Sequence, residues 1–296
     1  KGMNQYKYHC VVSNGAGSVT SRKATLTVDY VPILHDDYPM DVTLRLGYDA
    51  TYEVHISEHG NPAEYSYQWY KAENATAKGT AISGAKSSSY TKKSVTKDDD
   101  QTYYYCVVTN KRGSVESRHA LLDVKYVPVL DSTKPQDTTV IEGKKAVFDV
   151  AISVKGNPDK YEYQWYRRTS GSNDWIEISG ATASEYTYQV SREDHESYYY
   201  CKVSNEVGSV RSKEAKLTVH WLPTLDSSYP KDAIATELVD GKDSATFETS
   251  ISISGNPAEY SYQWYEAKAG EQTGAIIKGA TNSSYTIEKL TKERDQ

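Results

Sequence analysis

The segment Tyr103–Val115 recurs in three copies along the chain. Tyr198–Val210 repeats it, and Tyr8–Val19 is a third copy close to the start. In each copy, aromatic and β-branched residues alternate with a period of two and then meet an Asn-x-x-Gly-Ser turn sequence. Alternation resumes after the turn, so each copy is predicted to be a β-hairpin whose glycine supplies the positive φ of a tight turn.

The three cysteines mark the period of this repeat. Cys10, Cys106 and Cys201 are spaced by about 95 residues, which is the size of a domain rather than of a short solenoid unit. The repeat phase predicts four domains, at residues 1–31, 32–127, 128–221 and 222–296. The first is expected to hold only a final hairpin and the last to lack one, which suggests a piece of a longer protein.

Neighbouring repeats are joined without a Gly/Ser-rich linker. Tyr30–Leu34, Tyr126–Leu130 and Trp221–Leu225 each carry a central proline, which suits an edge strand and stiffens the backbone. The last strand of one domain is therefore expected to run directly into the first strand of the next. No segment has helical periodicity, so we predict an all-β, extended array.

The charge and hydropathy of the chain exclude several classes of partner. A net charge of −6 and a pI near 5.7 argue against binding to a nucleic-acid backbone. No apolar run approaches the ~18 residues of a membrane span.

The spacing of three residues resembles a known family. Trp69, followed by Tyr104 and Cys106 two residues apart, resembles the core of an immunoglobulin domain of the I-set type. The Tyr-Gln-Trp-Tyr and Ile-x-Gly-Ala sequences are most similar to immunoglobulin-like repeats of bacterial cell-surface proteins. The resemblance implies tandem β-sandwiches, two complete and two partial, with an extracellular or cell-surface location. It assigns these residues to the structural core: Trp69, Tyr104, Cys106, Trp165, Tyr199, Cys201, Trp264, Tyr8 and Cys10.

The chain departs from that family at the second cysteine. The aligned positions are Val54, Val150 and Thr249, so the usual disulfide between the sheets cannot form. Each remaining cysteine is expected to act as a small buried hydrophobe, with an intermolecular bridge or a reactive thiol as alternatives. The resemblance also implies that Tyr8, Tyr104 and Tyr199 are tyrosine corners, with hydroxyls bonded to upstream backbone.

Strand alternation predicts a candidate binding face. If Tyr104 and Cys106 point inward, their neighbours point outward, next to a tyrosine on the adjacent strand. The face would consist of Tyr70, Tyr103 and Tyr105 in one repeat and of Tyr166, Tyr198 and Tyr200 in the next. Such tyrosines could contact a protein or a sugar ring. The alternative is cross-strand pairing that only stabilises the sheet.

Motifs for catalysis are not found. The sequence contains no Gly-x-Ser-x-Gly elbow, phosphate loop or Cys-x-x-Cys, and its histidines do not form a cluster. We therefore expect no enzyme activity and no cofactor. Acidic residues recur near the junctions, where they could bind calcium or simply occupy turns: Asp36, Asp37, Asp41, Asp131, Asp137, Asp226 and Asp232. Asp98–Asp100 is expected to be an exposed turn.

These observations favour a non-catalytic spacer or adhesion module with a protein or carbohydrate ligand. Two alternatives stay open: an accessory binding array of an extracellular enzyme, and an animal-type adhesion or sarcomeric array. The incomplete terminal domains also suggest head-to-tail association between chains.

Overall fold

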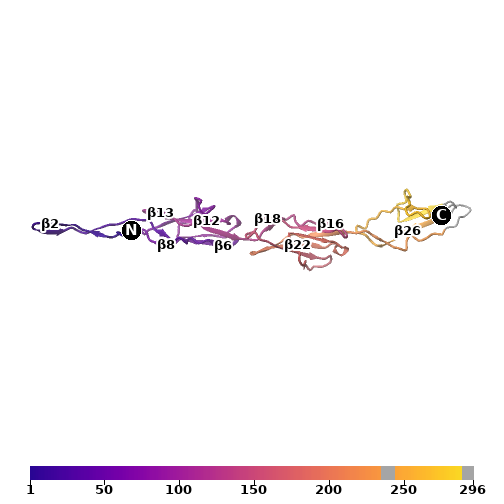
Figure 1. The fold of residues 1–296 in the computed structure, drawn as a ribbon, viewed down its shortest axis with the longest axis horizontal. Helices are drawn as coiled ribbons and strands as arrows, with labels where there is room; N and C mark the ends of the chain where they lie inside the picture. The colour runs from indigo at the N-terminus through magenta and orange to yellow at the C-terminus, as the bar shows by residue number, and fades with distance from the viewer. Residues whose placement is uncertain (235–243, 289–296) are drawn as a thin grey trace. The chain divides into compact units, whose positions relative to one another are not determined.

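The computed structural model describes residues 1–234 and 244–288. The chain divides into two compact units. One unit comprises residues 1–129, 152–161 and 204–210, and the other comprises 130–151, 162–203 and 211–296. Figure 1 follows the strands along the chain by colour, from β2 near the N-terminus to β26 in the last repeat.

The N-terminal strands form the predicted hairpin. Strand β1 pairs with β4, and β2 pairs with β3 around a turn in which Gly17 has a φ of 144°. Gly113 has a φ of 158° at the corresponding turn of the next repeat, as expected. The strand bounds are β1 Lys7–Tyr8, β2 Val11–Asn14, β3 Gly17–Thr20 and β4 Ala24–Thr25.

The first complete repeat folds into two layers. One sheet has the order β10-β9-β12-β14-β6, with β13 paired to β12 and β6 parallel to β14. Facing it are the pairs β11-β7 and β5-β8. The bounds are β5 Ile33–Leu34, β6 Val42–Arg45, β7 Ala50–Glu53, β8 Ile56–Glu58, β9 Ser66–Ala72, β10 Thr80–Ala81, β11 Ser89–Lys92, the 3₁₀ turn η1 Lys97–Asp99, β12 Thr102–Asn110, β13 Gly113–Glu116 and β14 Ala120–Lys125.

The core of this repeat lies between the two sheets. Cys106 on β12 is directly opposite Trp69 on β9, and both are 0% exposed. The Trp69 Nε1–H donates to the Ser87 carbonyl at 2.9 Å, which satisfies its one polar atom. From the facing sheet, the Tyr52 ring stacks on Tyr104 with centroids 4.8 Å apart. This arrangement confirms the immunoglobulin-like sandwich.

The second complete repeat uses the same sheet order, β16-β24-β22-β19-β20. Trp165 and Cys201 are again 0% exposed, and Phe148 replaces Tyr52 with its ring 4.5 Å from that of Tyr199. The bounds are β15 Val129–Leu130, β16 Thr138–Ile141, β17 Lys145–Asp149, β18 Ile152–Val154, β19 Glu162–Arg168, β20 Ile176–Glu177, β21 Glu185–Gln189, η2 Arg192–Asp194, β22 Tyr198–Asn205, β23 Gly208–Arg211 and β24 Ala215–His220.

The last repeat is described only in short strand pairs: β25 with β27, β26 with β30, and β28 with β29. Their bounds are β25 Thr224–Leu225, β26 Ser244–Glu248, β27 Ile251–Ile253, β28 Tyr265–Glu266, β29 Ala275–Ile276 and β30 Ser284–Glu288. The four predicted domain boundaries stay predictions, as does the extended arrangement.

Three of the expected core residues are not in a closed core. Tyr8 is 47% exposed, Cys10 is exposed and Trp264 is only half-buried. A strand face is buried only where a second layer covers it, and within the described ranges no second sheet packs on β1–β4. Assigning these three residues to a buried core was therefore wrong.

The tyrosine corners are also absent in the expected form. The Tyr199 hydroxyl bonds to the Tyr188 hydroxyl rather than to upstream backbone. The Tyr104 hydroxyl is buried and makes no hydrogen bond of ordinary geometry to the described part of the chain. Both rings turn toward the facing sheet, where they stack on Phe148 and Tyr52, and this packing directs their hydroxyls into the core.

Truncating Trp69 tests how far packing substitutes for the missing disulfide. Because its indole is fully buried, we expect Trp69→Ala to lower the free energy of unfolding of its repeat by about 3–5 kcal/mol. Tyr48→Ala, at a side chain 65% exposed, is the control and should change it by less than ~0.5 kcal/mol. Chemical denaturation followed by circular dichroism measures both; equal effects would contradict a Trp-centred core.

Candidate functional sites

The face of the first complete repeat is built around Tyr105. Its ring stacks on Tyr70 at a centroid distance of 5.0 Å and on His119 at 4.1 Å. The Tyr105 hydroxyl accepts a hydrogen bond from the Gly79 N–H at 3.1 Å. Because of these contacts, Tyr105 is only 3% exposed. The prediction that its side chain is exposed on the outer face is therefore wrong. Tyr70 and Tyr103 are half-buried.

The face of the second complete repeat is cationic as well as aromatic. Tyr166 stacks on Tyr200 at 4.8 Å, and the Arg211 guanidinium lies 3.8 Å from the centre of the Tyr200 ring. Trp175 meets Tyr200 edge-on at 4.6 Å. Tyr198 is covered by a second guanidinium, that of Arg168, at 4.7 Å. The predicted tyrosines are thus brought together here. We call these residues with Glu214 the arginine–tyrosine face.

The charge of the arginine–tyrosine face is only partly compensated. Glu214 reaches both guanidiniums, at 2.6 Å from an Arg211 nitrogen and 3.3 Å from an Arg168 nitrogen. The single carboxylate of Glu214 therefore forms ion pairs with two guanidinium groups. Guanidiniums stacked on aromatic rings present a pre-organised surface for carboxylates and backbone carbonyls.

One position explains why the two faces differ. Gly79 and Trp175 each directly precede the short edge strand that pairs with β9 or β19. A Cβ at Gly79 would lie 2.6 Å from the Lys71 carbonyl oxygen and 3.0 Å from the Tyr105 ring, so no larger residue fits there. The second repeat instead places Trp175 over its tyrosines. The sequence analysis missed Trp175 and His119 because they join the face from outside the patterned strands. Arg168 lies two residues after Tyr166 on β19, so alternation could have placed it on the same face. Arg211 is the last residue of the hairpin strand β23.

The cysteines occupy two kinds of environment. Cys106 and Cys201 are fully buried, and burial raises the pKa of each thiol to about 12. These two behave as the small hydrophobes that the sequence predicts. All three cysteines are free thiols, and Cys10 is exposed.

Several junction aspartates shape turns. The Asp131 carboxylate accepts from the Thr133 N–H at 2.8 Å and from its hydroxyl at 2.7 Å. Asp226 does the same with Ser228, at 2.9 and 2.6 Å. These hydrogen bonds hold the pKa of both carboxyls below the ordinary value. No cluster of three or more metal-ligating side chains occurs in the ranges that the structure covers.

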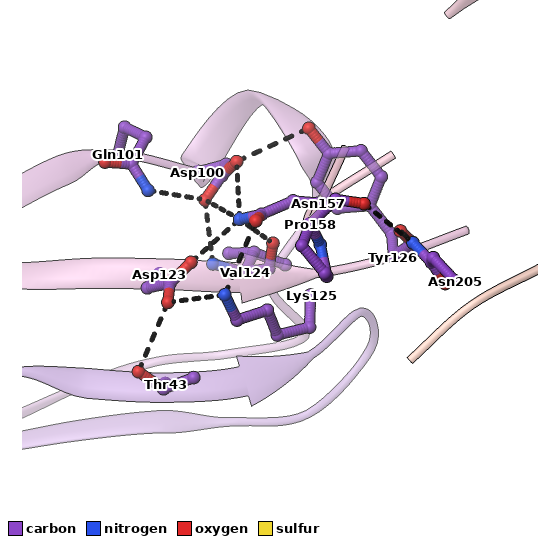
Figure 2. A network of polar contacts seen from close by, with 10 residues as sticks. All are labelled: Thr43, Asp100, Gln101, Asp123, Val124, Lys125, Tyr126, Asn157, Pro158 and Asn205. Carbon is purple, nitrogen blue, oxygen red and sulfur yellow. Dashed lines mark hydrogen bonds and ion pairs between the residues drawn. The ribbon is translucent and has the colours of Figure 1, made fainter. Parts of the chain in front are cut away.

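The Gly-Asn-Pro turn has a role that the sequence did not indicate. Asn157 exchanges two backbone hydrogen bonds with Tyr126, each 2.9 Å long. Its side-chain nitrogen donates to the Val124 carbonyl at 2.9 Å and to Asp123 at 2.7 Å, as Figure 2 shows. Asn205 adds a donor to the Tyr126 carbonyl at 2.9 Å. The turn of one repeat thus holds the last strand of the repeat before it, and we call this set of contacts a junction clamp.

The same clamp recurs three times. Asn61 pairs with Tyr30 through two 2.9 Å backbone bonds, and Asn256 pairs with Trp221 through two bonds of 3.0 Å. Glycine is required before each asparagine: a Cβ at Gly156 would lie 2.8 Å from the Tyr126 oxygen. The available sequence signal was that Gly-Asn-Pro and the proline-containing junctions recur in the same phase.

Asp100 belongs to a junction clamp. It was expected in an exposed turn, but its carboxylate accepts from the Val124 N–H at 2.8 Å. It also receives the Asn157 amide at 3.3 Å and the Tyr126 hydroxyl at 3.4 Å (Figure 2). The neighbouring Asp99 is buried. The exposed-turn prediction is therefore wrong for both residues, because folding brings distant backbone donors to this turn.

Comparison with known proteins gives relatives of mixed function. No family model matches the chain. It is 28% identical over 182 residues to the B-cell receptor CD22 of Mus musculus, and 29% identical over 182 residues to Endoglucanase C of Cellulomonas fimi. Each match covers 61% of this chain but only 19% and 16% of those proteins. The human cell adhesion molecule DSCAM is 30% identical over 141 residues, covering 45% of this chain and 7% of DSCAM.

Similar solved structures are tandem immunoglobulin domains. The first two domains of DIP-gamma give a TM-score of 0.48 at 17% identity, covering 64% of this chain and 99% of theirs. The titin I-band fragment I67–I69 gives a TM-score of 0.46 at 21% identity, covering 88% of this chain and 89% of its own. Among the described residues, no helix is long and apolar enough to cross a membrane.

Thiol labelling tests the two cysteine environments. At pH 8 the native chain should react rapidly at Cys10 alone, because the thiols of Cys106 and Cys201 are buried and have a pKa of about 12. Cys10→Ser should abolish the rapid reaction, and denaturant should release the buried thiols. Rapid labelling of either buried cysteine in the folded chain would overturn this assignment.

Proposed function

We propose that this chain, whose complete repeats are immunoglobulin-like β-sandwiches, is a non-catalytic spacer and adhesion region located at the cell surface or outside the cell. The observation that carries the proposal is the junction clamp. In each repeat the Gly-Asn-Pro turn is occupied in holding the preceding strand, so the turn serves to connect domains rather than to line a cleft. The immunoglobulin-domain relatives, which include a cell adhesion molecule, support the same role.

The ligand proposed for the arginine–tyrosine face is a protein rather than a sugar. Sugar binding needs an open aromatic ring, but Tyr200 is already contacted by Tyr166, Arg211 and Trp175. The incompletely neutralised guanidiniums favour an acidic, hydrogen-bonding protein surface, and arginine and aromatic residues commonly dominate such interfaces.

A second candidate function is an accessory binding array of an extracellular enzyme. The match to Endoglucanase C supports it, since a segment of that enzyme is 29% identical to this chain. In that case, the ligand would be a polysaccharide or another surface near the enzyme's substrate, and catalysis would reside outside these repeats.

An array of extracellular-matrix proteins, glycans and polysaccharides, probed with the 296-residue chain, distinguishes the two candidates. We expect protein binding that Arg211→Ala weakens about tenfold or more, because the face loses its stacked cation. Lys213→Ala, two residues away and outside the face, is the matched control and should leave affinity unchanged. Binding to polysaccharides alone would favour the accessory array. Binding insensitive to Arg211→Ala would remove the face from the proposal.

Head-to-tail self-association is also part of the proposal. The hairpin exposes Val12 (62%) and Val19 (72%), whereas Val108, at the position of Val12 in the next repeat, is 0% exposed. In the last repeat, Trp264 is half-buried and lines an apolar groove with Leu225 and Ile251. In the complete repeats, a hairpin of the same sequence pattern pairs with the strand that carries the tryptophan, and Cys106 lies opposite Trp69. The hairpin of a second copy therefore fits the groove.

Sedimentation of the whole chain over a wide concentration range tests this association. We expect the average mass to rise with concentration, and Val12→Lys to suppress the rise, because a charge would enter the apolar groove. Val11→Lys is the matched control: its counterpart Val107 is only half-buried, so the effect should be smaller. A chain that stays monomeric throughout would eliminate the proposal.

A further inference from the structure

Each junction clamp contains a side chain that accepts a hydrogen bond from the backbone of the preceding repeat's last strand. The three acceptors lie at the same repeat position but differ in chemistry. Asn4 accepts from the Val28 N–H at 2.9 Å, and Asp100 accepts from the Val124 N–H at 2.8 Å. At the third position the acceptor is the Nδ1 of His195, which is 3.1 Å from the Val219 nitrogen.

The contact with Val219 determines the protonation state of His195. A ring nitrogen that accepts a hydrogen bond carries no proton, so the imidazole is neutral with its proton on Nε2. The Asn256 amide lies 3.4 Å from both ring nitrogens and donates to the Val219 carbonyl at 2.6 Å. The His195 ring also meets Trp221 edge-on at 5.3 Å. The histidine therefore contacts both sides of the clamp, the strand and the Gly-Asn-Pro turn.

We propose that this third junction clamp is a pH-sensitive device, which holds when His195 is neutral and loosens when the ring gains a second proton. The protonated ring has N–H groups at both nitrogens, so Nδ1–H would face the Val219 N–H, and two donors would meet. The clamps at Asn4 and Asp100 present an amide oxygen and a carboxylate oxygen at this position, and neither is a ring nitrogen that becomes an N–H donor on protonation.

Among the described residues, the charged groups around His195 include Glu196, whose carboxylate interacts electrostatically with the ring, but the ion pairs of these groups provide no second acceptor for Nδ1. Arg192, in η2, pairs with Glu142 at 2.8 Å, and Glu196 pairs with Lys216 at 2.6 Å. Both cations near the imidazole ring, Arg192 and Lys216, are thus already paired with a carboxylate. From the last repeat, the facing group is the neutral Asn256 amide, and from β24 it is the backbone of Val219. Within the described part of the chain, the side chain of His220, also on β24, makes no hydrogen bond to the clamp.

The sign of the effect follows from proton linkage. The closed clamp requires the neutral ring, whereas an opened clamp accepts a proton freely. The opened state therefore binds more protons, and the stability of the clamp falls as the pH falls through the range in which histidine titrates.

Amide hydrogen exchange of the whole chain tests the proposal. After correction for the intrinsic pH dependence of exchange, protection at Val219 should fall about three- to tenfold between pH 7.5 and pH 5, as expected for the loss of one hydrogen bond. Protection at Val28 and Val124 should stay constant and serves as the internal reference. Equal losses at all three amides, or no loss at Val219, would overturn the proposal.

Substitutions separate titration of His195 from a general effect of acid. His195→Asn copies the acceptor of the first clamp, and it should make the protection at Val219 independent of pH over this range. His220→Asn is the matched control and should leave the wild-type pH response intact. A response that persists in His195→Asn, or disappears in His220→Asn, would refute the assignment to His195.

The tautomer provides a readout that needs no substitution. Nitrogen NMR of the folded chain at pH 7.5 should find the His195 proton on Nε2 and an unprotonated Nδ1. A proton on Nδ1 at that pH would contradict the hydrogen bond on which the proposal depends.

Discussion

A backbone hydrogen-bond exchange between an asparagine and an aromatic residue is the interaction that recurs at all three described junctions. In each junction clamp, the N–H and C=O of Asn61, Asn157 or Asn256 pair with those of Tyr30, Tyr126 or Trp221. The preceding glycine permits the close approach, because its Cβ would otherwise occupy the space of the partner's carbonyl oxygen. A short turn therefore binds the backbone at each junction. The side chains around it contribute further hydrogen bonds to the same contact.

Within the complete repeats, which have no disulfide between the sheets, the two sheets are held together by packed side chains. A tryptophan, a cysteine and a tyrosine from one sheet meet an aromatic ring from the other, Tyr52 in one repeat and Phe148 in the next. The buried thiols fill volume in the apolar interior, and burial keeps them protonated. Each complete sandwich thus encloses a single, fully buried indole, that of Trp69 or Trp165.

The same fold carries different surfaces in the two complete repeats. Gly79 allows the first repeat to close over Tyr105, whereas Trp175 and two arginines build an aromatic and cationic surface in the second. The junction position held by Asn4, Asp100 and His195 varies in the same way while its hydrogen bond is kept. Function in such an array therefore resides in the residues that differ between repeats and not in the shared fold.

The sequence by itself determined the repeat period, the all-β class and the hairpins, because alternation and turn chemistry act between residues close in the chain. The buried Trp69, Cys106 and Tyr104 were implied by the resemblance to immunoglobulin domains. Only the tertiary structure decided that His119 covers Tyr105 and that Tyr8 and Cys10 are exposed to solvent. It also decided that the Gly-Asn-Pro turn and Asp100 belong to a junction clamp. Those outcomes depend on groups brought together from distant segments, such as Asn157 and Tyr126. A local pattern shows which way a side chain points along its strand, but not which distant segment will cover it.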